Sequence, residues 1–129
     1  MIVLKFKDTP QFGECCVACD NEPMPWKDSA ECVVGVKSII GCESIDIVDI
    51  GHFIDLFVDD EGLMKPNPKP NWIATALRTI HWVKSNGEIL VPAGYPPLCG
   101  VCVALSHNDE GETVDLNEEQ VKYLEGFLK

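Results

Sequence analysis

Short apolar runs bounded by turn-forming residues predict the β-structure in the first half of the chain. Residues 2–6 predict a first strand, and a loop rich in proline, cysteine and aspartate follows as far as Trp26. Residues 43–50 and 53–58 predict two further strands. Because Gly51 begins a tight turn between these strands, we expect them to pair as an antiparallel hairpin.

Apolar residues at three- and four-residue spacing predict three helices. The first follows Ser29, a residue that commonly caps helices, and ends at Gly41. The second begins after Asn71 and runs to about residue 84, because the three prolines before it exclude an earlier start. The third begins after Asn117, with a glutamine three residues later in the position of a capping box.

The remaining strands complete the predicted fold class. Residues 88–91 and 98–105 predict two more strands, separated by proline and glycine. The sum is an α+β fold with a small antiparallel sheet and about three helices. Since 129 residues suit one hydrophobic core, we expect a single domain over residues 1–129. Residues 1–30 form a variable N-terminal strand and loop, and residues 31–129 form the core.

Charge and hydropathy exclude several classes of protein. The chain has 21 acidic residues against 10 Lys and Arg, a net charge of -11 that repels nucleic-acid phosphates. We therefore expect no direct nucleic-acid binding. No apolar run approaches the ~20 residues that span a bilayer, and the first residues lack the apolar region of a secretion signal. These features predict a cytoplasmic protein without membrane contact, and they are compatible with a homo-oligomer.

The charge is unevenly distributed along the chain. Residues 62–87, here called the basic island, contain no acidic residue but hold four cations and two of the three tryptophans. Aromatic faces near cations suit a ligand that carries a ring and a phosphate. The alternative is an ordinary helix with positive surface charges and buried tryptophans. The candidate ligand-binding residues are Lys65, Asn67, Lys69, Asn71, Trp72, Thr75, Arg78 and Trp82.

Two of these residues have competing interpretations. Asn71 can cap the second helix, or it can mark a helix terminus whose free amides bind an anion. Arg78, the only arginine, is predicted to lie outside the buried stripe that includes Ile73 and Leu77. If the basic island is a pocket, Arg78 contacts the ligand from an exposed position. Otherwise it pairs with a carboxylate on the neighbouring hairpin, Asp55 or Asp59.

A family resemblance rests on two motifs, VDDEGL at residues 58–63 and NWIATAL at residues 71–77. These motifs resemble the signature V-D-x-E-G-L, proline-containing spacer, N-x-x-A-T-x-L of a family of small uncharacterised domains from bacteriophages, plasmids and conjugative elements. The resemblance covers roughly residues 33–124 and leaves residues 1–30 outside. It implies an origin in a mobile element and no assigned activity.

Seven cysteines without a secretion signal favour reduced thiols or a metal site over disulfides. Two C-x-x-C pairs have the spacing of zinc knuckles, and four thiolates satisfy tetrahedral zinc. In the alternative interpretation the second pair consists of small buried residues of a strand. Structural zinc is the one cofactor that the sequence suggests. The candidate ligands are Cys16, Cys19, Cys99 and Cys102.

No motif predicts catalysis, because His52, His81 and His107 lack a sequence-adjacent partner of the kind that activates a nucleophile or base. We therefore expect a non-enzymatic protein, and three hypotheses remain. The first is a phage or mobile-element accessory protein that counters host defence by sequestering a small anionic, nucleotide-type ligand. The second is an acidic inhibitor or nucleic-acid mimic that binds a host defence enzyme. The third is a structural adaptor stapled by zinc.

Overall fold

The computed structural model describes residues 1–86 and 95–128, and within them one antiparallel sheet and three α-helices confirm the predicted α+β class. The strand order is β2-β1-β5-β4-β3, and β6 extends the sheet from β5. The elements in chain order are β1 (Ile2–Thr9), β2 (Gly13–Ala18), α1 (Ser29–Ile40), β3 (Ile45–Asp49), β4 (Ile54–Asp59), the short 3-10 helix η1 (Gly62–Met64), α2 (Trp72–Asn86), β5 (Cys102–His107), β6 (Thr113–Val114) and α3 (Glu118–Leu128).

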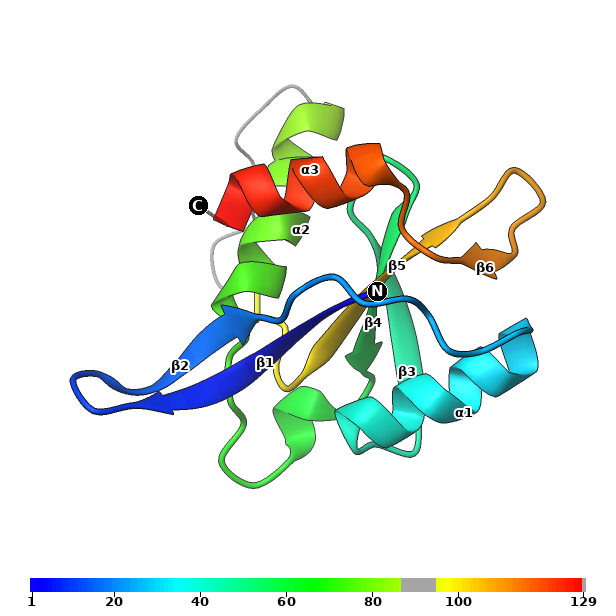
Figure 1. Ribbon diagram of the computed structural model, residues 1–129. Helices are drawn as coiled ribbons and strands as arrows, with labels where there is room; N and C mark the ends of the chain where they lie inside the picture. Colours follow the sequence, from blue (N-terminus) through cyan, green and yellow to red (C-terminus); the bar gives the residue numbers. More distant parts are fainter. Residues whose placement is uncertain (87–94, 129) are drawn as a thin grey trace.

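Helices cover both faces of the sheet. Figure 1 shows α2 and α3 on one face and α1 on the other. Along β4, Ile54 and Leu56 pack toward α2 and α3, whereas Phe57 packs toward α1. In β5, Ala104 and Leu105 divide between the two faces in the same way. The alternation buries both faces of these two strands, which explains their almost continuous apolar sequence.

Part of the N-terminal segment that was predicted as a loop is a strand. β2 pairs with β1 in an antiparallel hairpin, with Ala18 opposite Leu4. Thr9 closes the turn, because its hydroxyl donates to Gly13 O at 2.9 Å and accepts from Phe12 N at 3.1 Å. The prediction was wrong because the strand is half-exposed at the sheet edge, and its two adjacent cysteines lack the β-branched pattern of a typical strand.

The predicted helix starts are confirmed to within one residue, and α2 ends at Asn86, two residues beyond its predicted end. Asp28 caps α1 in place of Ser29, since its carboxylate accepts from the backbone N–H three residues later at 2.8 Å. Gly41 ends α1 with a left-handed φ of 77°. Asn117 and Gln120 exchange two hydrogen bonds of 2.9 Å at the start of α3, which is the predicted capping box. In the described part of the chain, no helix is long and apolar enough to cross a membrane.

The strand predicted to begin at residue 98 starts later. β5 begins at Cys102, because the residues before it run beside the proline-containing spacer instead of joining the sheet. An isolated β-bridge between Pro70 and Cys99 joins the two segments. The spacer itself contains no α-helix, as predicted. The predicted strand over residues 88–91 lies outside the described residues.

Candidate functional site

Three residues of the basic island lie on the exposed spacer between η1 and α2. Lys65 forms an ion pair with Asp59, and Lys69 forms one with Glu14 at 2.9 Å. Asn67 takes a left-handed φ of 53° in the same spacer. The three residues line a hollow of about 260 Å³. Because a carboxylate lies beside each lysine, the net charge around each pair is close to zero, and an anionic ligand is attracted only weakly.

Two other predicted residues are used inside the fold. Asn71 is 0% exposed, and its side-chain oxygen accepts from the backbone N–H three residues later at 3.1 Å. Its amide donates to Leu4 O and Gly100 O at 3.1 and 3.0 Å. The Thr75 hydroxyl donates to Asn71 O at 2.8 Å and accepts from Leu98 N at 3.0 Å. The cap interpretation of Asn71 is therefore confirmed, and its side chain fills the terminus where an anion was the alternative.

Arg78 is buried, so its predicted exposed position is wrong. Its residue exposure is 6%, and the buried stripe of α2 consists of Ala74, Leu77 and Arg78 itself. The segment before β5 packs along this side of the helix and covers it, as its bond to the Arg78 guanidinium shows. Among the described residues, no carboxylate forms an ion pair with Arg78. The expected partners are engaged elsewhere, Asp55 with the imidazole of a histidine and Asp59 with a lysine.

The guanidinium of Arg78 packs against two aromatic rings that also contact each other, with 4.8 Å between the ring centroids. Its central carbon is 4.8 Å from the centroid of the Trp82 ring and 4.9 Å from that of Tyr95. Nη2 donates to Pro96 O at 2.8 Å, whereas buried Nε has no hydrogen-bond partner among the described residues. Burial lowers the pKa of Arg78 from its ordinary value. The group is thus a buried cation with unfilled hydrogen-bonding capacity.

A hollow of about 510 Å³ opens beside this guanidinium, and we call it the Arg78 hollow. α2 contributes Arg78 and Trp82 to its wall, and the segment before β5 contributes Tyr95 and Pro96. The edge strand β3 and the residues after β4 contribute the carboxylates of Asp46, Asp49 and Asp60. The hollow therefore places one cation and two aromatic rings near several acceptors.

The structure separates the eight predicted ligand-binding residues. Only Arg78 and Trp82 among them line the Arg78 hollow. Trp72 is 62% exposed and lies outside it. Sequence reasoning missed Tyr95 and Pro96, which reach α2 from a distant part of the chain and carry no motif. Asp46 and Asp49 were visible as acidic residues of a predicted strand, but the sequence did not indicate which helix they would face.

Comparison with known families places most of the chain in one group. Residues 27–129 match a domain of unknown function, DUF3846. The chain belongs to this family. The DUF3846 domain of the protein thus contains all the helices and strands described above except the β1–β2 hairpin. No curated protein and no solved structure matches the chain.

Within the DUF3846 domain, the two sequence motifs hold the connection between β4 and α2 against the segment before β5. A Cβ atom on Gly62 would lie 2.6 Å from the backbone oxygen of Cys99, so a side chain does not fit there. Asp59 accepts from Glu61 N at 2.9 Å and closes the turn after β4. Together with buried Asn71, these contacts show that the motif residues stabilise the fold.

The cysteines of the protein are not gathered into the predicted zinc site. Among the described residues, no group of three or more His, Cys, Asp or Glu side chains could hold a metal ion. Cys16 in β2 donates its S–H to Asn71 Oδ1 at 3.0 Å. Cys102 begins β5 on the far side of β1, and burial is the main cause that raises its pKa to about 12. The nearby thiols of Cys16 and Cys99 also raise this pKa, but in the described part of the chain the four predicted ligands do not form a group that could hold zinc.

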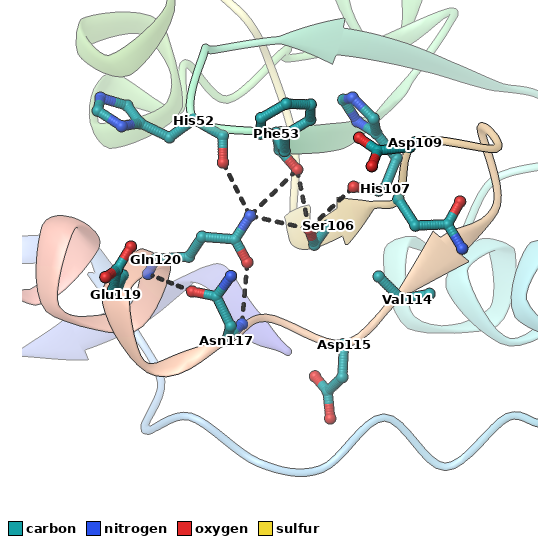
Figure 2. Close-up of a pocket in the computed structure, with 11 residues that line it drawn as sticks. His52, Phe53, Ser106, His107, Asp109, Val114, Asp115, Asn117, Glu119 and Gln120 are labelled. Carbon is teal, nitrogen blue, oxygen red and sulfur yellow. Dashed lines mark hydrogen bonds between the residues drawn. The ribbon is translucent and has the colours of Figure 1, made fainter.

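A second cavity, drawn in Figure 2, was missed at the level of sequence. It contains His107, whose Nδ1 lies 2.9 Å from Asp55 Oδ2. The two residues are 52 positions apart and meet because β4 and β5 pair in the sheet, with Ile54 opposite Ser106. A search for sequence-adjacent partners of histidine could not find this pair.

Proposed function

We propose that the protein is a non-enzymatic accessory protein of a bacteriophage or related mobile element that binds and sequesters a small anionic, nucleotide-type ligand of host defence. The origin rests on the resemblance of its two motifs to domains from such elements. The ligand class rests on one observation, which is that the buried residue Arg78 packs its guanidinium against two aromatic rings at the wall of the Arg78 hollow.

The hydrogen bonds of Arg78 favour an anionic ligand. A buried guanidinium is unfavourable unless acceptors satisfy its N–H groups. Nη2 of Arg78 donates a hydrogen bond to Pro96 O, and Nε has no hydrogen-bond acceptor among the described residues. Cation–π contacts with Trp82 and Tyr95 offset part of the loss of hydration. A phosphate or carboxylate that reached the guanidinium from the Arg78 hollow would add charge-assisted hydrogen bonds.

The opposite wall of the Arg78 hollow narrows the ligand class. Because Asp46, Asp49 and Asp60 line it, a ligand that carries only negative charge is repelled. A nucleotide suits both walls. Its phosphate provides acceptors for Arg78, and its base and ribose provide N–H and O–H donors for the carboxylates.

Thermal unfolding with candidate ligands tests the proposal. The full chain is heated with cyclic oligonucleotides, ADP-ribose derivatives, mononucleotides and inorganic phosphate, and small molecules released on denaturation are identified by mass spectrometry. A ligand at a hundred times its Kd adds about 2.7 kcal/mol to the free energy of unfolding, which is a clear rise in Tm. We expect a nucleotide to raise Tm and inorganic phosphate to have little effect.

Two variants locate the binding site. Arg78→Lys keeps the charge but removes the planar fork that binds phosphate in a bidentate way, so the ligand-dependent rise in Tm should largely disappear. Lys69→Gln removes one positive charge from the hollow of about 260 Å³ beside the spacer, and it should keep the ligand-dependent rise in Tm. If no nucleotide raises the Tm of the native chain, or if both variants respond as the native chain does, the proposal is wrong.

The charge distribution favours a second candidate, an acidic inhibitor that occupies the nucleic-acid site of a host defence enzyme. Outside the basic island, the sequence contains 21 acidic residues and only six lysines. Asp46 and Asp49 are exposed on the edge strand β3. A charge mimic binds its target with an affinity that falls steeply with salt. Pull-down from host lysate at low and high salt tests this, and recovery of no nucleic-acid-binding enzyme at low salt would contradict it.

A further inference from the structure

A cavity of about 560 Å³ lies where β5 and β6 meet the turn between β3 and β4 and the first turn of α3 (Figure 2). None of the residues that line it lines the Arg78 hollow, so the two sites are separate. The side chains that matter for its chemistry are those of His52, Phe53, His107, Asp109 and Glu119.

The turn between β3 and β4 holds an aromatic ring at the mouth of this cavity. His52 and Phe53 have left-handed φ angles of 56° and 59°, a conformation that costs side-chain-bearing residues about 1 kcal/mol or more each. Gln120 holds the turn, because its amide donates to His52 O at 2.8 Å and to Phe53 O at 3.3 Å. Phe53 in this turn is 56% exposed, and the centroid of its ring lies 5.4 Å from that of His107.

His107 lines the same cavity. Its Nδ1 lies 2.9 Å from the carboxylate of Asp55, whose side chain is 13% exposed. In the neutral ring Nδ1 carries the proton that Asp55 accepts, and Nε2 keeps a lone pair. No described residue hydrogen-bonds to Nε2. A group that enters the cavity can therefore donate to it.

The rest of the wall also offers acceptors. Asp109 and Glu119 line the cavity and have no ion-pair partner among the described residues. Asp115 is already paired with the amino group of Met1 at 2.7 Å. Figure 2 shows the Asp109 carboxylate on the His107 side of Phe53 and Glu119 on the other side. Among the described residues, no lysine or arginine lines the cavity.

We propose that this cavity binds a guanidinium group, supplied either by an arginine side chain of a partner protein or by a small free guanidine. A guanidinium has five N–H donors in one plane, which matches a wall of imidazole and carboxylate acceptors. Its flat face packs on an exposed aromatic ring, and Phe53 provides one. The inference is independent of the Arg78 hollow and of its ligand.

Titration of the full chain with N-acetylarginine amide tests the inference. N-acetylcitrulline amide has nearly the same shape but a neutral urea in place of the guanidinium, so it is the matched control ligand. Calorimetry gives the affinities, and NMR signals of the histidine and phenylalanine rings give the place of binding. We expect the arginine compound to shift the His107 and Phe53 signals and to bind about tenfold more tightly than the citrulline compound, a factor that corresponds to about 1.4 kcal/mol.

Agmatine and the peptide Gly-Arg-Gly distinguish the two sources of the group. Equal affinity of both points to a small free guanidine, and tighter binding of the peptide points to an arginine of a partner chain. Either result supports the inference. Equal binding of the arginine and citrulline compounds, or the absence of any shift at His107, overturns it.

Two isosteric variants separate a built site from general attraction by an acidic surface. Asp109→Asn removes a lining carboxylate, and it should weaken the arginine compound about tenfold. Glu110→Gln removes the same charge from the next residue, which is exposed and does not line the cavity, so the affinity should be unchanged. An equal loss in both variants means that the cavity does not bind the guanidinium.

Discussion

Replacement of Asn71 by alanine should destabilise the protein far more than the loss of an ordinary surface residue. Asn71 is 0% exposed and joins four segments, since its side chain contacts the start of α2, β1, β2 and the residues before β5. Alanine removes every one of these side-chain hydrogen bonds. We therefore expect a large decrease in the free energy of unfolding with no change in the overall fold.

The magnitude follows from the bonds that are lost. Removal of an N-cap side chain costs about 1 kcal/mol. Leu4 O and Gly100 O each lose a donor of 3.1 or 3.0 Å in a buried or partly buried place, and each loss costs about 1 kcal/mol. The sum is about 3 kcal/mol, which in a chain of this size lowers Tm by about 10 °C.

Urea unfolding monitored by circular dichroism measures the loss. The slope of the free energy against urea concentration should not change, because the native and unfolded states expose the same surface as before. Asn71→Ser is the matched control. Its hydroxyl can still cap α2 but cannot donate to both carbonyls, so it should recover about 1 kcal/mol of the loss. A loss below about 0.5 kcal/mol in Asn71→Ala, the range of surface substitutions, would show that this network does not stabilise the fold.

Three further predictions test other parts of the structure. Gly62→Ala should lower the midpoint of urea unfolding by an amount equivalent to about 1–3 kcal/mol, because the new Cβ would meet Cys99 O at 2.6 Å; an unchanged midpoint would contradict this contact. Burial raises the pKa of Asp115, but hydrogen bonds from the N-terminal ammonium and a backbone N–H outweigh it and lower the pKa overall. The Asp115 carboxylate therefore stabilises the fold above its unfolded pKa of about 3.9, and this stabilisation is lost as pH falls through the lower folded pKa. In Asp115→Asn, the free energy of unfolding measured in urea should decrease less between about pH 5 and pH 2 than it does in the native chain. Arg78→Ala should lower Tm without any ligand, since it leaves a cavity and frees Pro96 O; an unchanged Tm would mean that Arg78 is exposed in solution.

Local patterns were sufficient to predict much of the fold. The hairpin of β3 and β4, the left-handed Gly41 and the capping box of α3 depend on residues close together in the chain, and all three are confirmed. The same logic failed for β2, because an edge strand is half-exposed and its apolar pattern is weak. It also misplaced the start of β5, where contact with the distant spacer outweighs the strand propensity of the residues before Cys102.

The candidate site was less predictable than the fold, for a physical reason. The basic island contains no acidic residue in its sequence, but the fold brings acidic residues next to it. Lys65 pairs with Asp59 at the end of β4, and Lys69 pairs with Glu14 in β2. The position of Arg78 depended on which side of α2 faces the sheet. Helical spacing predicted one buried stripe, with Ile73 and Leu77, and the packing of Pro96 buries the side with Arg78 as well.

Arg78 links the proposed ligand to the stability of the fold. The segment before β5 is attached to α2 by the bond from Arg78 to Pro96 O and by the bond from Leu98 N to Thr75, and Tyr95 packs on the Arg78 guanidinium. A ligand in the Arg78 hollow would contact both the helix and this segment, since both line it. It would therefore bind the folded chain and have no comparable site in the unfolded chain, which is the condition for stabilisation by a ligand. For the same reason Arg78→Ala confounds binding with folding, whereas Arg78→Lys retains the charge and most of the side-chain volume and tests the planar fork itself.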